Sequence, residues 1–324
     1  DEGLRDLASR LRDSEKEFTI GVREGEPHEM IGGIGGLSTD DNGRIFLLDA
    51  ENKEIRVYDS TGNYMQSLGG PGEGPEEFET ASVFDRRSDG TLVVGGLGPA
   101  KLFSPGFVHE STIELGYRAQ DLCLTEEHLF VRGFAGSMGG AAGKANYIHA
   151  YAAADGKRSH RFSAEYDSPN PLVVMDYAPG EIACNSEHEG VFSAASGLPL
   201  VYGYQSDGSV RWVSRIAEFT PNQIEEGYNE GSPSVSFVEQ GFSDRISFMT
   251  LVPGGYLLVQ VSRAASDEVR EDRDDLGTHT YIFSTQTGEG IYTGQPVPGV
   301  YHATSDYLYA WGEQEFPQVR VLEY

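Results

Sequence analysis

Short apolar runs separated by turn residues recur along this chain. Residues 37–68 hold four such runs, and the sequences DDNG, DAENK and DSTGN divide them. Two of the runs, IFLL at 45–48 and IRVY at 55–58, have the β-branched and aromatic content of strands, and the turns contain Asn-Gly and Thr-Gly pairs. The pattern predicts one four-stranded antiparallel unit.

The same pattern recurs four more times before the end of the chain. These further units span residues 79–115, 117–166, 172–217 and 245–293. In the unit at 172–217 we assign the first two strands to LVVMD and EIACNS. Five complete units are therefore predicted, and such repetition is typical of solenoids and propellers.

The two ends of the chain complement one another. Residues 300–324 hold three strand-like runs, and EFTIGV at 17–22 is a fourth run that precedes the first unit. If this N-terminal strand pairs with the last three, a ring of six units closes and no sheet edge stays open. We therefore predict an all-β fold, a six-bladed β-propeller of four-stranded antiparallel blades, as a single domain over residues 17–324.

Residues 1–16 are predicted to form a short N-terminal extension ahead of the ring. Leu4, Leu7 and Leu11 are spaced by three and four residues, which is the spacing of one face of an amphipathic helix. We expect this helix to pack on the ring through its leucines.

The stretch at 37–78 resembles the NHL-type propeller repeat. The shared features are an Asp-x-x-Gly turn before a hydrophobic strand, an Arg-aliphatic pair, an aromatic-Asp-x-x-Gly turn and a glycine-rich connector. The residues that carry them are Asp40, Gly43, Asp49, Asn52, Ile55, Arg56, Val57, Tyr58, Asp59, Gly62, Gly74, Pro75 and Phe78. The whole chain is similar to six-bladed propellers of bacterial secreted and lipoprotein repertoires, most of which have no assigned reaction. This resemblance implies an extracytoplasmic protein, either periplasmic, secreted or lipid-anchored after removal of a leader.

The glycine-rich connector at 69–78, GGPGEGPEEF, has two interpretations. It can cradle a phosphate, or it can let the chain turn sharply between two blades while Phe78 fills the space between them. We favour the structural interpretation, because its three glutamates would repel an anion and no P-loop lysine follows. Likewise, we interpret Asp49, Asn52 and Arg56 as a turn clasp within the first blade and not as catalytic groups.

Charge narrows the range of partners. Lys and Arg number 24 and Asp and Glu 51, which gives a net charge of -27. Such a surface repels nucleic acid and anionic lipid, so we expect neither as a partner. It is also typical of halophilic proteins, and the other interpretation is simply an acidic protein. No apolar run reaches the roughly 18 to 20 residues of a membrane-spanning helix, so we do not expect the chain to insert into a bilayer. We expect a monomer.

The two cysteines, Cys123 and Cys184, lie far apart in the sequence and form no CxxC pair. Their spacing predicts neither a zinc site nor a disulfide framework. Because each lies in a strand-like apolar run, we interpret both as buried thiols.

The longest connections predict a binding face. Alternating strand directions place the connections at 69–78, 133–146, 218–242 and 262–278 on one face of the ring, and long loops on a rigid scaffold are frequent binding sites. We therefore expect a binding or scaffold propeller that holds a protein, peptide or glycan and needs no cofactor. The candidate ligand-binding residues are Arg86, Met138, Lys144, Asn146, Tyr228, Asn229, Phe237 and Tyr301.

A second hypothesis is a metal-dependent hydrolase or lyase. Some six-bladed propeller enzymes hold calcium or zinc on the axis, where the ion acts as a Lewis acid. By analogy, Asp121, Asp176 and His302 would form part of such a site on the inner strands. The sequence leaves both hypotheses open.

Overall fold

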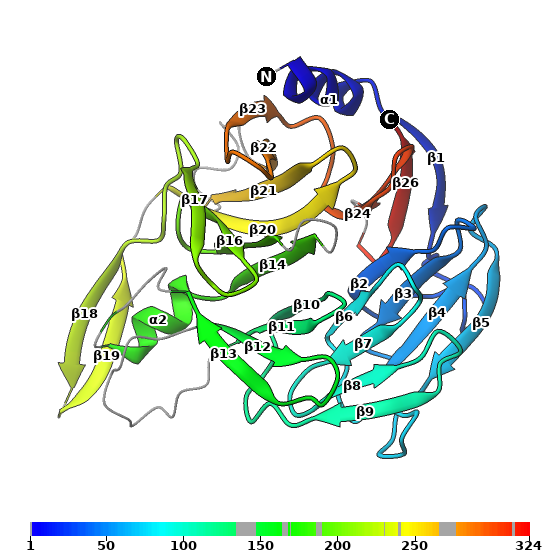
Figure 1. The fold of residues 1–324 in the computed structure, drawn as a ribbon. Helices are drawn as coiled ribbons and strands as arrows, with labels where there is room; N and C mark the ends of the chain where they lie inside the picture. Colours follow the sequence, from blue (N-terminus) through cyan, green and yellow to red (C-terminus); the bar gives the residue numbers. More distant parts are fainter. Residues whose placement is uncertain are drawn as a thin grey trace.

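The computed structural model describes residues 2–133, 147–163, 168, 170–185, 190–229, 231–238, 241–265, 277–312 and 315–324. Six four-stranded antiparallel sheets surround a common axis, as Figure 1 shows. The prediction of a six-bladed β-propeller is therefore confirmed. No helix in the described ranges has the length and apolar character needed to cross a bilayer.

The first three blades follow the predicted units. Blade one contains β2 (Ile34–Thr39), β3 (Ile45–Asp49), β4 (Glu54–Tyr58) and β5 (Tyr64–Gly69). Blade two contains β6 (Val83–Arg86), β7 (Leu92–Gly95), β8 (Ala100–Phe103) and β9 (His109–Ile113). Blade three contains β10 (Asp121–Leu124), β11 (His128–Arg132), β12 (Ile148–Ala152) and β13 (Arg158–Phe162). In each blade the first strand is innermost and consecutive strands pair.

Blades four and five have the same order. Blade four contains β14 (Gly180–Asn185), β15 (Gly190–Ala195), β16 (Leu200–Gln205) and β17 (Val210–Arg215). Blade five contains β20 (Phe242–Val252), β21 (Tyr256–Ala265), β22 (Gly277–Ser284) and β23 (Gly290–Gly294).

Blade six joins the two ends of the chain, as predicted. It contains β24 (Val300–Ala303), β25 (Tyr307–Trp311), β26 (Val319–Glu323) and, outermost, β1 (Glu15–Ile20). The pairing of β1 with β26 is antiparallel. It closes the ring by hydrogen bonds between the two ends of the chain.

The N-terminal helix α1 (Glu2–Arg12) packs on the ring, as its leucine spacing predicts. Leu4, Leu7 and Leu11 are buried in one hydrophobic cluster with residues of blades five and six, among them Ile282. Arg10 also donates a hydrogen bond to the carbonyl of Ser305 at 2.7 Å. The helix therefore covers the seam between the last two blades.

The strand assignment of blade four was wrong by one strand. The run LVVMD lies in the helix α2 (Pro171–Tyr177), and the inner strand of the blade is β14. Asn170 caps this helix, since its side chain accepts a hydrogen bond from the Leu172 N–H at 3.0 Å, and Pro171 occupies the first turn. A short apolar run does not by itself distinguish a strand from a helix, and here the cap decides.

The connection at 218–242 contains a hairpin that the sequence reading did not predict. Strands β18 (Ile224–Asn229) and β19 (Ser232–Phe237) form a two-stranded antiparallel sheet of their own. In Figure 1 this hairpin extends away from the ring beside α2. We call α2 and this hairpin the arm.

The interpretation of the cysteines as thiols is also wrong. Cys123 on β10 and Cys184 on β14 form a disulfide, with their Cα atoms 5.7 Å apart. These are neighbouring inner strands, so the ring brings together two residues that the sequence separates by 61 positions. The disulfide joins blade three to blade four.

The connector at 69–78 has the structural arrangement that the sequence predicts. Gly69 has a positive φ of 81°, and a side chain there would meet the ring of Phe78. Phe78 is 2% exposed and packs edge-on against Phe103. Lys101 donates hydrogen bonds from Nζ to two connector carbonyls at 2.7 Å, which fixes the turn.

The clasp in blade one is likewise present. The buried carboxylate of Asp49 accepts hydrogen bonds from the N–H groups of Gly32 and Asn52 at 3.0 and 3.1 Å. Its Oδ2 atom also lies 3.0 Å from Nη2 of Arg56, which is 2% exposed. Asp49 thus ties the entry into blade one to its second and third strands.

Candidate functional site

The inner strands of the six blades enclose an axial channel of about 810 Å³. Its wall is chemically uneven around the ring. Asp85, Asp121 and Glu181 line it from blades two, three and four. Aliphatic and aromatic residues of β20 line it on the far side. The volume is large enough for a small ligand.

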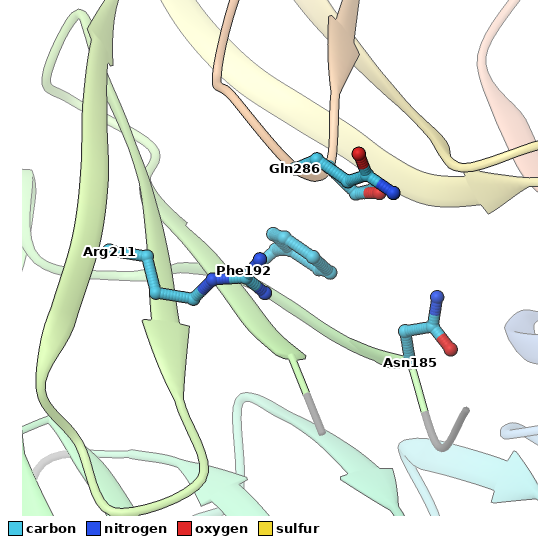
Figure 2. A pocket seen from close by; sticks show the side chains of 5 residues that line it. Asn185, Phe192, Arg211 and Gln286 are labelled. Carbon is cyan, nitrogen blue, oxygen red and sulfur yellow. The ribbon is translucent and has the colours of Figure 1, made fainter. Parts of the chain in front are cut away.

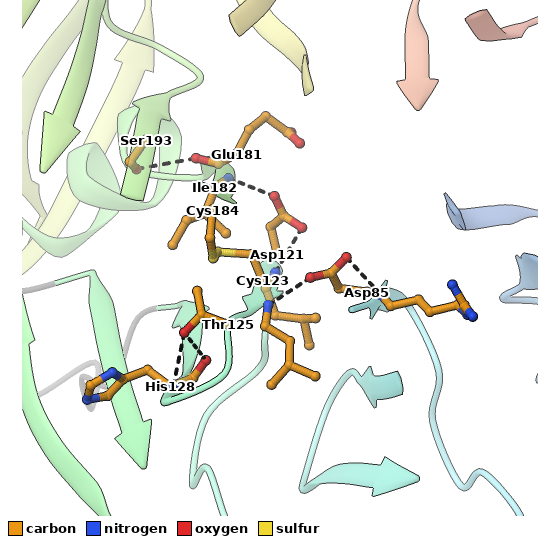
Figure 3. The surroundings of a disulfide bond; sticks show 12 residues. Asp85, Asp121, Cys123, Thr125, His128, Glu181, Ile182, Cys184 and Ser193 are labelled. Atoms are coloured by element: carbon orange, nitrogen blue, oxygen red, sulfur yellow. Dashed lines mark hydrogen bonds between the residues drawn. A yellow bond between two sulfur atoms is a disulfide. The ribbon is translucent and has the colours of Figure 1, made fainter. Parts of the chain in front are cut away.

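Two of the acidic residues hold neighbouring blades together. Asp121 Oδ2 accepts a hydrogen bond from the backbone N–H of Ile182 in blade four at 2.7 Å, while Oδ1 accepts one from Leu122 N–H at 2.8 Å. Asp85 contacts Leu124 N–H in blade three in the same way at 2.7 Å. Figure 3 shows these contacts beside the disulfide. The two carboxylates therefore have a structural role in the ring.

The acidic wall favours protonated carboxyl groups. Burial inside the ring raises the pKa of Asp121 to about 7, in spite of its two backbone hydrogen bonds. Burial raises the pKa of Glu181 well above its usual value, and the neighbouring Asp121 raises it further. The pKa of Asp85 is also raised by burial. The pKa of at least one channel carboxyl group is therefore raised into the neutral range.

The channel wall also contains a neutral histidine from blade six and a cation from blade two. His302 Nε2 lies 3.0 Å from Thr39 Oγ1, and burial lowers the pKa of His302 to about 4. Arg86 donates a hydrogen bond to the Thr39 carbonyl at 3.2 Å and lies over the ring of Phe46. Tyr301 packs edge-on against a phenylalanine of blade five, and burial raises the pKa of Tyr301 to about 12. All of these groups are uncharged at neutral pH except Arg86.

The predicted metal ligands do not come together. Asp121 and His302 line the channel, but Asp176 lies on α2 and not on an inner strand, because the run that contains it is helical. Its carboxylate forms an ion pair with Arg245, which also donates to the Asp176 carbonyl at 3.1 Å. In the described ranges, no three His, Cys, Asp or Glu side chains are grouped so that they could hold a metal ion.

The other predicted ligand-binding residues fall into three groups. Arg86 and Tyr301 line the channel. Tyr228, Asn229 and Phe237 lie on the hairpin of the arm. Met138, Lys144 and Asn146 lie outside the described residues, as does most of the connection at 262–278.

The arm exposes large apolar side chains while its base is fixed. Tyr228 and Phe237 are 61% and 60% exposed, and Met175 on α2 is 53% exposed. Asn170 donates from Nδ2 to the Ser234 carbonyl at 3.1 Å, which ties the start of α2 to β19.

Sequence reasoning missed Met175 because it assigned this segment to an inner strand. The signal that could have located it is the Asn-Pro pair before the apolar run, since Asn is a favoured N-cap and Pro a favoured first helical residue.

Comparisons with known proteins agree with this fold. Residues 28–124 match the model of a family, DUF5128, described as "6-bladed beta-propeller". No curated protein matches the chain.

Solved structures share the fold at low sequence identity. A member of the duf4221 family from Bacteroides vulgatus is 8% identical, with a TM-score of 0.62 over 96% of this chain and 97% of that chain. A Bacteroides fragilis chain described as a "Putative exported protein" is 11% identical, with a TM-score of 0.54 over 95% and 94%. The extracellular domain of a one component system from B. thetaiotaomicron is 12% identical, with a TM-score of 0.54 over 93% of this chain and 35% of that chain. These likenesses show the fold alone.

Proposed function

We propose that this six-bladed β-propeller is an extracytoplasmic binding or scaffold module, and that its arm holds a protein, peptide or glycan. The observation that carries the proposal is the hairpin β18–β19, which extends from the ring with exposed aromatic side chains. A ligand that covers those side chains would remove apolar surface from water.

The register of the hairpin places both aromatic side chains on one face. Ile224 pairs with Phe237, and Tyr228 pairs with Pro233. Residues 224 and 228 are four positions apart on one strand, so their side chains point to the same side. Tyr228 and Phe237 therefore form two contact points roughly 13 Å apart along the strand direction. That spacing suits an extended peptide or two units of a glycan.

The hairpin also offers backbone groups. Within the described residues, β18 pairs with no strand other than β19, and α2 packs beside β19, so the outer edge of β18 is the one that can accept a further strand. An extended peptide can add to such an edge as a further strand. The role that we propose for the arm requires no cofactor.

The disulfide supports a location outside the cytoplasm. The bond between Cys123 and Cys184 uses both cysteines of the chain, and cytosolic proteins seldom keep structural disulfides because the compartment is reducing. Two of the structures that share the fold are described as exported or extracellular. The net charge of -27 disfavours nucleic acid as the partner.

Binding to displayed peptide and glycan libraries tests this proposal. We expect the native chain to select a ligand and the double variant Tyr228→Ala/Phe237→Ala to bind it at least about tenfold more weakly, since central aromatic contacts dominate interfaces. Val108→Ala is a matched control, because Val108 is 58% exposed and lies on a short turn of blade two at the opposite face. Unchanged binding by the double variant would remove the arm as the site.

A further inference from the structure

A second, smaller pocket lies between blades four and five, near the mouth of the channel that faces away from the arm. It measures about 300 Å³ and is lined by Asn185, Phe192, Arg211, Thr285 and Gln286, as Figure 2 shows. Asn185 and Gln286 also line the channel, so the two spaces adjoin. The arm belongs to connections between blades, which emerge at the opposite ends of the strands.

A β-bulge positions Arg211 in this pocket. In blade four Gly203 pairs with Trp212 and Tyr204 pairs with Val210, which leaves Arg211 as the extra residue. A bulge changes the direction of the side chain that it carries. The guanidinium group lies beside the start of β15, since a Cβ atom at Gly190 would be 3.4 Å from Arg211 Nη1.

The same bulge recurs in other blades without a cation. The corresponding extra residues in blades one, two and three are Met65, Glu110 and Ser159. The bulge is therefore a feature of the fold. Of these four blades, only blade four has an arginine at the bulged position. A structural need for the bulge does not explain the arginine.

Contacts between the blades hold the walls of the pocket in place. Trp212, next to Arg211, donates from Nε1 to the Thr285 carbonyl at 3.0 Å. Thr285 in turn donates from its N–H and its hydroxyl to the Gly255 carbonyl at 3.0 and 2.9 Å. Phe192 stacks on Trp212 with ring centroids 5.9 Å apart. The pocket is thus largely formed before any ligand enters, which lowers the entropic cost of binding.

Two polar side chains of the pocket have no partner among the described residues. Neither Arg211 nor Gln286 forms a hydrogen bond or an ion pair with any part of the chain that the structure describes. This contrasts with several other arginines of this acidic protein, which pair with carboxylates. The examples are Arg44 with Asp40, Arg56 with Asp49, Arg87 with Asp89, Arg245 with Asp176 and Arg263 with Asp244.

We propose that this pocket binds a small polyol that carries a carboxylate, of the size of one uronic acid. The guanidinium group of Arg211 has the planar fork that matches a carboxylate. The carboxamide of Gln286 can both donate to and accept from hydroxyl groups. The volume lies at the lower end of small-molecule sites and fits a single ring.

Calorimetric titration with D-glucuronate tests the site. We expect a dissociation constant on the order of millimolar for the native chain, because a single sugar offers few contacts. Arg211→Gln should weaken binding at least about tenfold, since it removes the charged partner of the carboxylate. Gln286→Ala should weaken it about threefold.

Arg215→Gln is the matched control. Arg215 lies on the same strand and is also exposed, but it is roughly 13 Å from Arg211 along the strand. This variant should bind glucuronate as the native chain does. No binding by the native chain at 50 mM ligand, or equal losses in Arg211→Gln and Arg215→Gln, would overturn the proposal.

Two further ligands test which chemical groups the pocket recognises. Methyl glucoside lacks the carboxylate and acetate lacks the polyol, so both should bind at least about fivefold more weakly than glucuronate. Equal binding of either would contradict the proposed ligand class. The double variant of the arm, Tyr228→Ala/Phe237→Ala, should leave this titration unchanged, so the two proposals fail independently.

Discussion

The seam between blades two and three and the seam between blades three and four use the same contact in different surroundings. In the first, the carboxylate of Asp85 accepts a hydrogen bond from Leu124 N–H at 2.7 Å. In the second, the carboxylate of Asp121 accepts one from Ile182 N–H, also at 2.7 Å. Both carboxylates lie on inner strands, and both reach the backbone of the next blade. The repeated fold explains this shared geometry.

The surroundings give the second seam further links. The disulfide of Cys123 and Cys184 crosses it covalently. The buried Arg132 on β11 also crosses it, donating to Ser193 Oγ and, at 2.8 Å, to the Ala178 carbonyl. At the first seam the described contacts include no disulfide, and the arginine that crosses it, Arg87, donates to the Thr125 carbonyl at 3.0 Å but is only partly buried.

The second seam also brings two carboxylates close together, so that they repel each other when both are ionised. Glu181 lies beside Asp121, whose charge raises the pKa of Glu181, and the charge of Asp85 in turn raises the pKa of Asp121. At the first seam Asp85 is followed by Arg86, whose charge partly opposes the rise in the pKa of Asp85. The comparison teaches that the fold repeats a backbone contact, while the adjacent side chains decide whether a seam responds to redox conditions or to pH.

Loss of the disulfide should have the largest effect on this contrast. The double variant Cys123→Ser/Cys184→Ser should be destabilised by about 2–4 kcal/mol, because the bond closes a loop with a sequence separation of 61. The expected fall in Tm is roughly 3–6 °C for a chain of this size.

Reductant provides the control for this prediction. The chain has only two cysteines, so a reducing agent should lower the Tm of the native chain by the same amount and leave the double variant unchanged. Calorimetry measures both shifts. A native chain whose Tm does not respond to reduction would show that the other contacts of the second seam suffice without the bond.

Removal of the carboxylates should have an intermediate effect that differs between the seams. Asp85→Ala leaves Leu124 N–H without its partner and should cost about 2 kcal/mol, or roughly 3 °C in Tm. Asp121→Ala should cost about 1 kcal/mol, because it also removes the repulsion from Glu181 and the disulfide still holds the seam. Urea unfolding at pH 7.5 measures both values.

Asparagine variants provide the matched comparison, since their side chains keep an oxygen that accepts the same N–H. Asp85→Asn should recover part of the loss seen with Asp85→Ala. Equal costs for the two alanine variants would mean that the surroundings do not distinguish the two contacts.

The same contrast shows what the sequence could and could not predict. The ring follows from local patterns, because each strand-turn unit is specified by adjacent residues, and the clasp of Asp49 with Arg56 lies within one unit. The disulfide could not be predicted, because the contact depends on how two inner strands face each other across a seam.

Asp121 was predicted on the axis, but its use as a link between blades depends on the exact tilt of β10 against β14, which no local pattern encodes. Arg211 was missed for a similar reason, since its bulge is a property of strand pairing.

The pH dependence of stability should show the smallest effect and separates the seams most directly. Burial raises the folded-state pKa of Asp121 to about 7 from the usual value of 3.8, so the folded chain holds this proton more tightly than the unfolded chain. The stabilisation from this group is fully present below about pH 4 and is lost as the pH rises through about 7. Between pH 6 and pH 7 the native chain should therefore lose about 1 kcal/mol, or roughly 1.5 °C in Tm, more than Asp121→Asn, whose amide does not titrate in this range. Glu181→Gln should reduce the slope as well, because burial raises the pKa of Glu181 itself well above its usual value. If Asp121→Asn and the native chain have the same profile while Asp85→Asn flattens it, the titrating carboxylate belongs to the first seam and the contrast between the seams is reversed.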